Sequence, residues 1–307
     1  MISLRYHVVT IVAVFLSLAL GLLAGSAFVQ PRLVEQLKKQ TDDLRTEARD
    51  LRSEITDIRS RVTALAGFTD AALPFLAEGR LLAEPVVIVA QEGVQDAVIA
   101  ESQRALNAGG ANLIATFSAR AKLASPDESD QLQLAQILGQ PDAAPEALPG
   151  LAASAIATRL ATAGKRPDPA NPDVLHELLS AGFLTSIGSQ VSDATLEQIG
   201  GPAQVVVVLS GGPNEQPSIA PEIFAVPLIQ ALETAGLSVA AGQSRDTAFA
   251  FVEQLRAGGN DGIVTVDDLD ASMGGAALVL GLQRLIVSGT GGAYGLADGT
   301  EVLPPPL

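Results

Sequence analysis

Residues 8–30 read VVTIVAVFLSLALGLLAGSAFVQ, and the predicted organisation of the rest of the chain follows from this apolar stretch. No Asp, Glu, Lys or Arg occurs between Arg5 and Arg32. A helix of about 23 residues is roughly 35 Å long, whereas the hydrocarbon core of a bilayer is about 30 Å thick. In lipid a chain must satisfy its own backbone hydrogen bonds, which a helix does. The sequence therefore predicts a transmembrane anchor over residues 1–30.

A cleaved signal peptide is the main alternative, because Ala24 and Ser26 have the small-residue spacing that a signal peptidase needs. The apolar run exceeds the usual 7–15 residues of a signal peptide, which favours an uncleaved anchor, and it is too long for a buried soluble helix. Basic residues flank the run on both sides and set no clear orientation. Long domains translocate largely regardless of charge, so we expect a single-pass cell-membrane protein with its bulk outside the cytoplasm.

Small residues recur at every fourth position of the predicted anchor, at Ala13, Ser17, Gly21 and Gly25. The Gly-x-x-x-Gly pattern lets two membrane helices approach backbone to backbone. Gly and Ala are also frequent in membrane helices without any such role. The pattern nominates Ser17, Gly21 and Gly25 as a helix-packing face.

Residues 31–66 show the pattern of a coiled-coil stalk. From Ala48 onward the apolar residues advance by alternating steps of three and four, with one extra four-residue step, a stutter, just before Ala48. Pro31 suits a first helical turn and Gly67 a helix stop. The predicted contact residues, called the seam below, are Leu37, Leu44, Leu51, Ile55, Ile58, Val62 and Leu65.

Three uses of the seam compete. A single amphipathic helix could lie back on the following domain, but the stripe is narrow, which suits a partner helix better. The preferred interpretation is a homodimer through anchor and stalk, parallel because the two anchors would be parallel. The seam could also receive helices of a different protein, such as a membrane partner.

The chain after the stalk predicts an α/β domain over residues 67–290, followed by a Gly/Pro-rich tail over 291–307. Short apolar runs alternate with helical patterns, which predicts a mainly parallel, doubly wound sheet covered on both faces. The predicted strands are 85–90, 111–117, 204–209, 237–240 and 262–266. The predicted helices are 69–80, 94–106, 128–138, 152–163, 221–235, 247–257 and 275–288, with His176 in a further helix after Asn171-Pro172. Residues 165–169 predict a turn or an exposed loop.

The composition narrows the possible functions. The net charge of −15 over 307 residues argues against binding nucleic acid or anionic lipid, both of which require basic patches. The sequence contains no cysteine, which removes disulfides, thiolate metal sites and cysteine nucleophiles. At 48% apolar residues the distal domain can bury a core, although aromatics make up only 4%.

Two polar segments follow predicted strands. Residues 210–212 (Ser-Gly-Gly) stand where α/β folds bind phosphates, but the full Gly-rich motif and a P-loop lysine are missing, so a plain turn is favoured. Residues 267–270 (Asp-Asp-Leu-Asp) could bind calcium, but an N-cap for the last helix is favoured. No nucleophile motif surrounds His176. We therefore predict a non-enzymatic protein without a cofactor or metal site.

Several short motifs resemble the MctB-type copper transporter family of actinobacteria. They are residues 1–7 (MISLRYH), 13–16 (AVFL), Leu20-Gly21, 265–270 (TVDDLD) and Tyr294-Gly295. The resemblance extends over the whole layout of anchor, stalk and α/β domain. The name of the family implies a role in copper export or tolerance. The resemblance also extends to similar proteins called SteB, and it therefore implies a second role, that of a septal envelope factor. In that role the coiled coil, together with a membrane partner, controls a peptidoglycan hydrolase.

The residues favour the second implication. Copper(I) is bound by thiolates and thioethers and copper(II) by imidazole, yet the chain has two His and two Met, with His7 and His176 far apart in sequence. A single helix cannot enclose a pore, so copper transport would require an oligomer. The main expectation is a coiled-coil scaffold that holds partners at the cell envelope, with a copper-export component as the alternative.

Overall fold

The computed structural model describes residues 4–164, 172–188, 190–213, 217–249, 251–259 and 262–306, and of residues 4 and 26–34 only the backbone. The chain divides into two compact units, Met1–Leu65 and Ala66–Leu307. Some predictions lie outside the described residues: the start of the N-terminal motif, the side chains of Ser26 and Pro31, and a predicted loop at 165–169.

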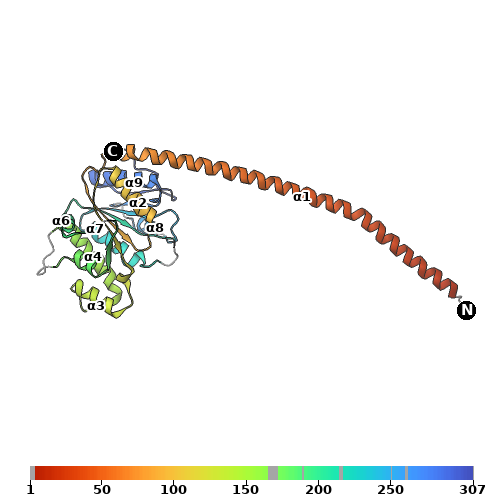
Figure 1. The fold of residues 1–307 in the computed structure, drawn as a ribbon, viewed down its shortest axis with the longest axis horizontal. Helices are drawn as coiled ribbons and strands as arrows, with labels where there is room; N and C mark the ends of the chain where they lie inside the picture. The colour runs from red at the N-terminus through yellow and green to blue at the C-terminus, as the bar shows by residue number, and fades with distance from the viewer. Residues whose placement is uncertain are drawn as a thin grey trace. The chain divides into compact units, whose positions relative to one another are not determined.

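The anchor and stalk form one uninterrupted helix, α1 (Leu4–Ala77), drawn from red to orange in Figure 1. The prediction that Gly67 stops this helix is wrong. A glycine ends a helix by taking a left-handed conformation, and Gly67 does not have a positive φ. The helix ends ten residues later, just before Gly79, whose φ is +70°. The predicted connecting helix at 69–80 is therefore the end of α1.

The second unit is built on a seven-stranded sheet in the order β3-β2-β1-β4-β5-β6-β7. All neighbouring pairs are parallel except β2 and β3, which are antiparallel. This confirms the α/β class with a mainly parallel sheet. The strands are β1 (Pro85–Gln91), β2 (Asn112–Ala119), β3 (Leu184–Ser186), β4 (Val205–Leu209), β5 (Ser238–Gly242), β6 (Val264–Val266) and β7 (Gly292–Tyr294).

Helices cover both faces of the sheet, with α2 and α9 on one side and α4 and α7 on the other (Figure 1). Side chains alternate along β1, so Val87 and Val89 enter one core while Val86 and Ile88 enter the other. The end of α1 joins the second core through Leu73. The remaining helices are α2 (Asp96–Ala108), α3 (Glu128–Ile137), α4 (Leu148–Ala161), α5 (Val174–Ser180), α6 (Asp193–Gln198), α7 (Ala225–Thr234), α8 (Phe251–Ala257) and α9 (Ser272–Ser288), with short 3-10 helices at Ala121–Ala124, Pro145–Ala147 and Pro221–Ile223.

Both edge strands, β3 and β7, and helix α6 were not predicted from the sequence. In particular, the segment predicted as a tail, 291–307, contains β7, which pairs in parallel with β6 and buries Tyr294. Each missed strand is three residues long, too short to show an alternating pattern. The two outermost strands of the sheet, β3 and β7, are thus defined by their pairing in the tertiary structure and not by a local sequence pattern.

Candidate functional site

The first candidate surface lies on α1. Residues Arg5–Gly25 are long and apolar enough to cross a membrane, since 21 residues of helix rise about 32 Å. In the nominated packing face, a Cβ added at Gly21 or Gly25 meets no atom within 4 Å. The chain itself therefore supplies no steric reason for glycine at these positions. The packing role of Ser17, Gly21 and Gly25 stays a prediction.

The seam forms the second part of this surface. Its seven residues are 47–65% exposed. Within α1 itself these side chains therefore have no covering partner element. The use of the seam as a partner interface stays a prediction, because exposure shows that these side chains are accessible for contact but does not identify a partner.

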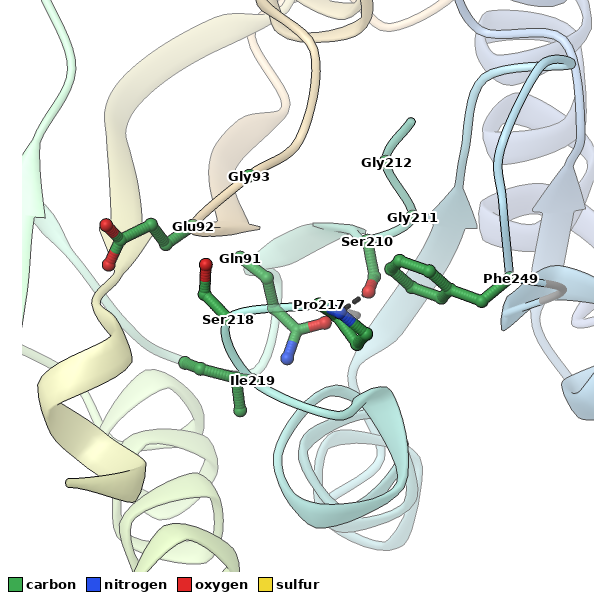
Figure 2. Close-up of a pocket in the computed structure, with 10 residues that line it drawn as sticks. All are labelled: Gln91, Glu92, Gly93, Ser210, Gly211, Gly212, Pro217, Ser218, Ile219 and Phe249. Carbon is green, nitrogen blue, oxygen red and sulfur yellow. Dashed lines mark hydrogen bonds between the residues drawn. The ribbon is translucent and has the colours of Figure 1, made fainter. Parts of the chain in front are cut away.

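The third candidate is a crevice in the sheet domain, shown in Figure 2. From β1 the chain crosses to β2 on one side and later returns to β4 on the other, so β1 and β4 flank the topological switch point. Open α/β sheets bind ligands beyond the carboxyl ends of the strands at such a point. The crevice lies there and is lined by Gln91, Glu92, Gly93, Ser210, Gly211, Gly212, Pro217, Ser218, Ile219 and Phe249.

The Ser-Gly-Gly segment of the sequence analysis forms one wall of this crevice. The Gly212 N–H donates to the Thr247 hydroxyl at 3.0 Å, and Gly211 has a φ of +91°. A Cβ on Gly212 would stand 2.7 Å from the Gly93 carbonyl oxygen, so glycine lets the loops after β1 and β4 approach closely. The described lining contains no Lys or Arg to bind phosphate.

Gln91, the last residue of β1, is the polar residue that the sequence analysis missed. It is 4% exposed, and its Oε1 accepts a hydrogen bond from the Ser210 hydroxyl (Figure 2). Its Nε2 has no partner among the described residues. The available signal was a polar residue directly after the continuous apolar run of residues 86–90.

Residues 267–270 follow β6, and their predicted role as a helix cap is wrong. The N-cap of α9 is Ala271, which has no side chain able to cap. Asp267 instead accepts from Arg256 Nη1 at 2.6 Å and from the Leu296 N–H at 2.7 Å. Asp270 accepts from the Arg245 N–H at 2.9 Å. These carboxylates therefore hold the loops beside β6 together.

Asp268 is 2% exposed, and neither of its carboxylate oxygens has a hydrogen-bond partner among the described residues. Burial is the main reason that the pKa of Asp268 is raised to about 6, and the negative charges of Asp267 and Asp270 contribute to the same shift. Because burial disfavours the charged form, the ionised carboxylate of Asp268 destabilises the folded state at neutral pH.

The described residues contain no group of three or more His, Cys, Asp or Glu side chains placed to hold a metal ion. His176 lies on α5 with its Nδ1 3.7 Å from the Asp193 carboxylate. The calcium interpretation of residues 267–270 gains no support from this arrangement.

These features define a class: a chain with one long N-terminal helix, whose first part is apolar and long enough to cross a membrane, followed by a doubly wound α/β domain. The chain belongs to the family described as "Copper transport outer membrane protein, MctB", whose model matches residues 1–305. The family resemblance seen in the sequence is thereby confirmed.

Named relatives match over nearly their whole length. A Mycobacterium tuberculosis protein called "Copper transporter MctB" is 28% identical over 325 residues, covering 97% of this chain and 98% of the relative. A Mycobacterium leprae protein of the same name is 28% identical over 330 residues, covering 100% of both chains. Anchor helix, stalk and sheet domain are therefore all included in the match.

Proposed function

We propose that this protein is a single-pass, membrane-anchored and non-enzymatic component of copper homeostasis at the cell envelope, acting as an oligomer through α1. The names of its family and relatives supply the link to copper. The structural observation that supports an oligomer is the exposed seam, which lies on the same helix as the apolar segment Arg5–Gly25. This reverses the order of preference reached from the residues alone.

A single copy of this chain has, in the part that the structure describes, too few membrane helices to form a pore, and association follows from that. One membrane helix cannot surround a pore, so any passage for an ion requires several copies or a partner. The sequence has no cysteine and two methionines, and is therefore poor in the ligands that copper(I) prefers. We therefore place the protein's role in assembly, with copper handled by the oligomer or by a partner membrane protein.

A deletion strain complemented with variants tests this role. The double substitution Ile55→Glu and Ile58→Glu places charges in the seam and should leave the strain hypersensitive to copper, because charges at coiled-coil core positions oppose association. The matched control is Ser53→Glu with Ser60→Glu, which adds the same charges on the opposite side of the heptad. It should restore wild-type tolerance, measured as growth across a copper series.

Two results would contradict the proposal. A deletion strain with normal copper tolerance would remove the link to copper. Equal rescue by the seam variant and its control would show that the seam is dispensable, provided that immunoblots show equal amounts of both proteins in the membrane.

The exposed seam also favours a second candidate, a scaffold whose stalk binds a membrane partner and thereby controls a peptidoglycan hydrolase at the septum. Here the partner's helices would cover the seam in place of a second copy. Pull-down from membranes with the full chain and with a chain lacking residues 31–66 tests this. Retention of the same proteins by both forms would argue against it.

A single introduced cysteine separates the two candidates, because the chain has none of its own. In a parallel homodimer Ile58→Cys brings two thiols together across the seam and should form a disulfide-linked dimer on mild oxidation. Ser60→Cys on the outer face should not. The same Ser60→Cys variant should react with a membrane-impermeant maleimide on intact cells if the bulk of the chain is extracytoplasmic.

A further inference from the structure

The crevice in Figure 2 has properties that the role of the stalk leaves unexplained. It lies at the switch point of the sheet, between the loops that follow β1 and β4. Its free volume is about 20 Å³. A water molecule needs about 10–15 Å³ of such free volume, so the crevice admits one small polar group and leaves the rest of any ligand at its mouth.

Beneath the crevice lies a buried carboxamide with a hydrogen-bonding group that has no partner among the described residues. Gln91 is 4% exposed, and its carboxamide is held in place by the Ser210 hydroxyl, which donates to Oε1. The Nε2 has no partner among the described residues. Buried side-chain amides are nearly always paired, so an unpaired donor beside a cavity indicates a group that a ligand can satisfy.

The walls determine the charge of that ligand. Glu92 is already committed, because its carboxylate accepts from the Ala121 N–H at 2.6 Å and pairs with Arg120 at 3.1 Å. The described lining includes no Lys or Arg, and the side chains of Ile219 and Phe249 make its walls partly apolar. Such a site favours an uncharged group over a phosphate or a carboxylate.

We propose that this crevice binds the amide group of a small uncharged molecule, with the amide oxygen accepting a hydrogen bond from Gln91 Nε2. The body of the ligand lies at the mouth of the crevice, against Phe249. An amide carries both a donor and an acceptor, so it also complements Gln91 with the two ends of its carboxamide exchanged.

Acetamide is the probe, and saturation-transfer NMR on the full-length protein in detergent micelles is the measurement. We expect binding in the millimolar range, because a ligand of four heavy atoms has little contact area. Gln91→Met keeps the length of the side chain but removes the amide, and should weaken binding at least about tenfold. Gln283→Met, on α9 and outside the crevice, should bind acetamide as the wild type does.

Ser210→Ala provides a second variant should Gln91→Met fail to fold, as judged by circular dichroism. It removes the hydroxyl that holds the carboxamide, and a smaller loss of affinity is expected. Absence of acetamide saturation in the wild type would show that a water alone fills the crevice and would overturn the proposal. So would equal saturation in all folded variants, or preferential binding of inorganic phosphate over acetamide.

Discussion

The stalk and the sheet use the same apolar residues in opposite ways. Leu, Ile and Val of the seam are 47–65% exposed, whereas Val205–Leu209 of β4 are at most 1% exposed. Composition alone would not separate the two regions. The difference comes from spacing: steps of three and four place apolar residues along one line of a helix, while a continuous run suits a strand that is covered on both faces.

This contrast has an energetic consequence. Burying a Leu, Ile or Val side chain is worth about 1.5–3 kcal/mol relative to leaving it exposed. The sheet domain obtains that stabilisation within one chain. If the seam pairs with another helix as proposed, the stability of the stalk should depend on association in a way that the stability of the domain does not.

The largest expected effect separates the two regions directly. Phe117 of β2 is fully buried, and Phe117→Ala should lower the free energy of unfolding of the sheet domain by about 3–5 kcal/mol because it leaves a cavity. Ile55→Ala in the stalk should leave the unfolding transition of the domain unchanged and weaken association instead. Chemical denaturation and crosslinking of the full chain measure both. A shift of the domain transition by Ile55→Ala would show that the regions are not independent.

A buried acid gives the second effect. Burial raises the pKa of Asp268 to about 6, above its ordinary value of 3.8, so the folded state binds the proton more tightly than the unfolded state. Stability from this proton is complete below pH 3.8 and is lost as the pH rises through about 6. Asp268→Asn should therefore raise the free energy of unfolding at pH 7.5, by at most about 3 kcal/mol, and change it little near pH 3.5.

The stalk offers the control for this prediction. Asp57 is exposed and forms an i,i+4 pair with Arg61 at 2.9 Å. Asp57→Asn should cost less than about 1 kcal/mol, since exposed ion pairs contribute little. Destabilisation by Asp268→Asn at pH 7.5 would mean that its carboxylate has a favourable partner after all.

The sequence predicts those parts of the fold that depend on the spacing of apolar residues along the chain. The apolar segment, the heptad pattern and the apolar runs of the long strands are all of this kind. The edge strands β3 and β7 are too short to show a pattern and are defined by pairing with β2 and β6. The crevice follows the same rule: residues 210–212 were visible as a motif, but Gln91 became notable only when β4 was placed beside β1.

The smallest effect concerns the helix that links the two regions. Because Gly67 lies inside α1 without a positive φ, and a Cβ there meets no atom within 4 Å, Gly67→Ala should stabilise the helix by about 1 kcal/mol. Gly79 has a φ of +70°, so Gly79→Ala should destabilise the chain by a similar amount even though its Cβ also meets open space. Thermal unfolding followed by circular dichroism measures both. Opposite signs at these two glycines would place the end of the helix at Ala77. Destabilisation by Gly67→Ala would instead restore the break predicted from sequence and would divide the stalk from the domain by a turn.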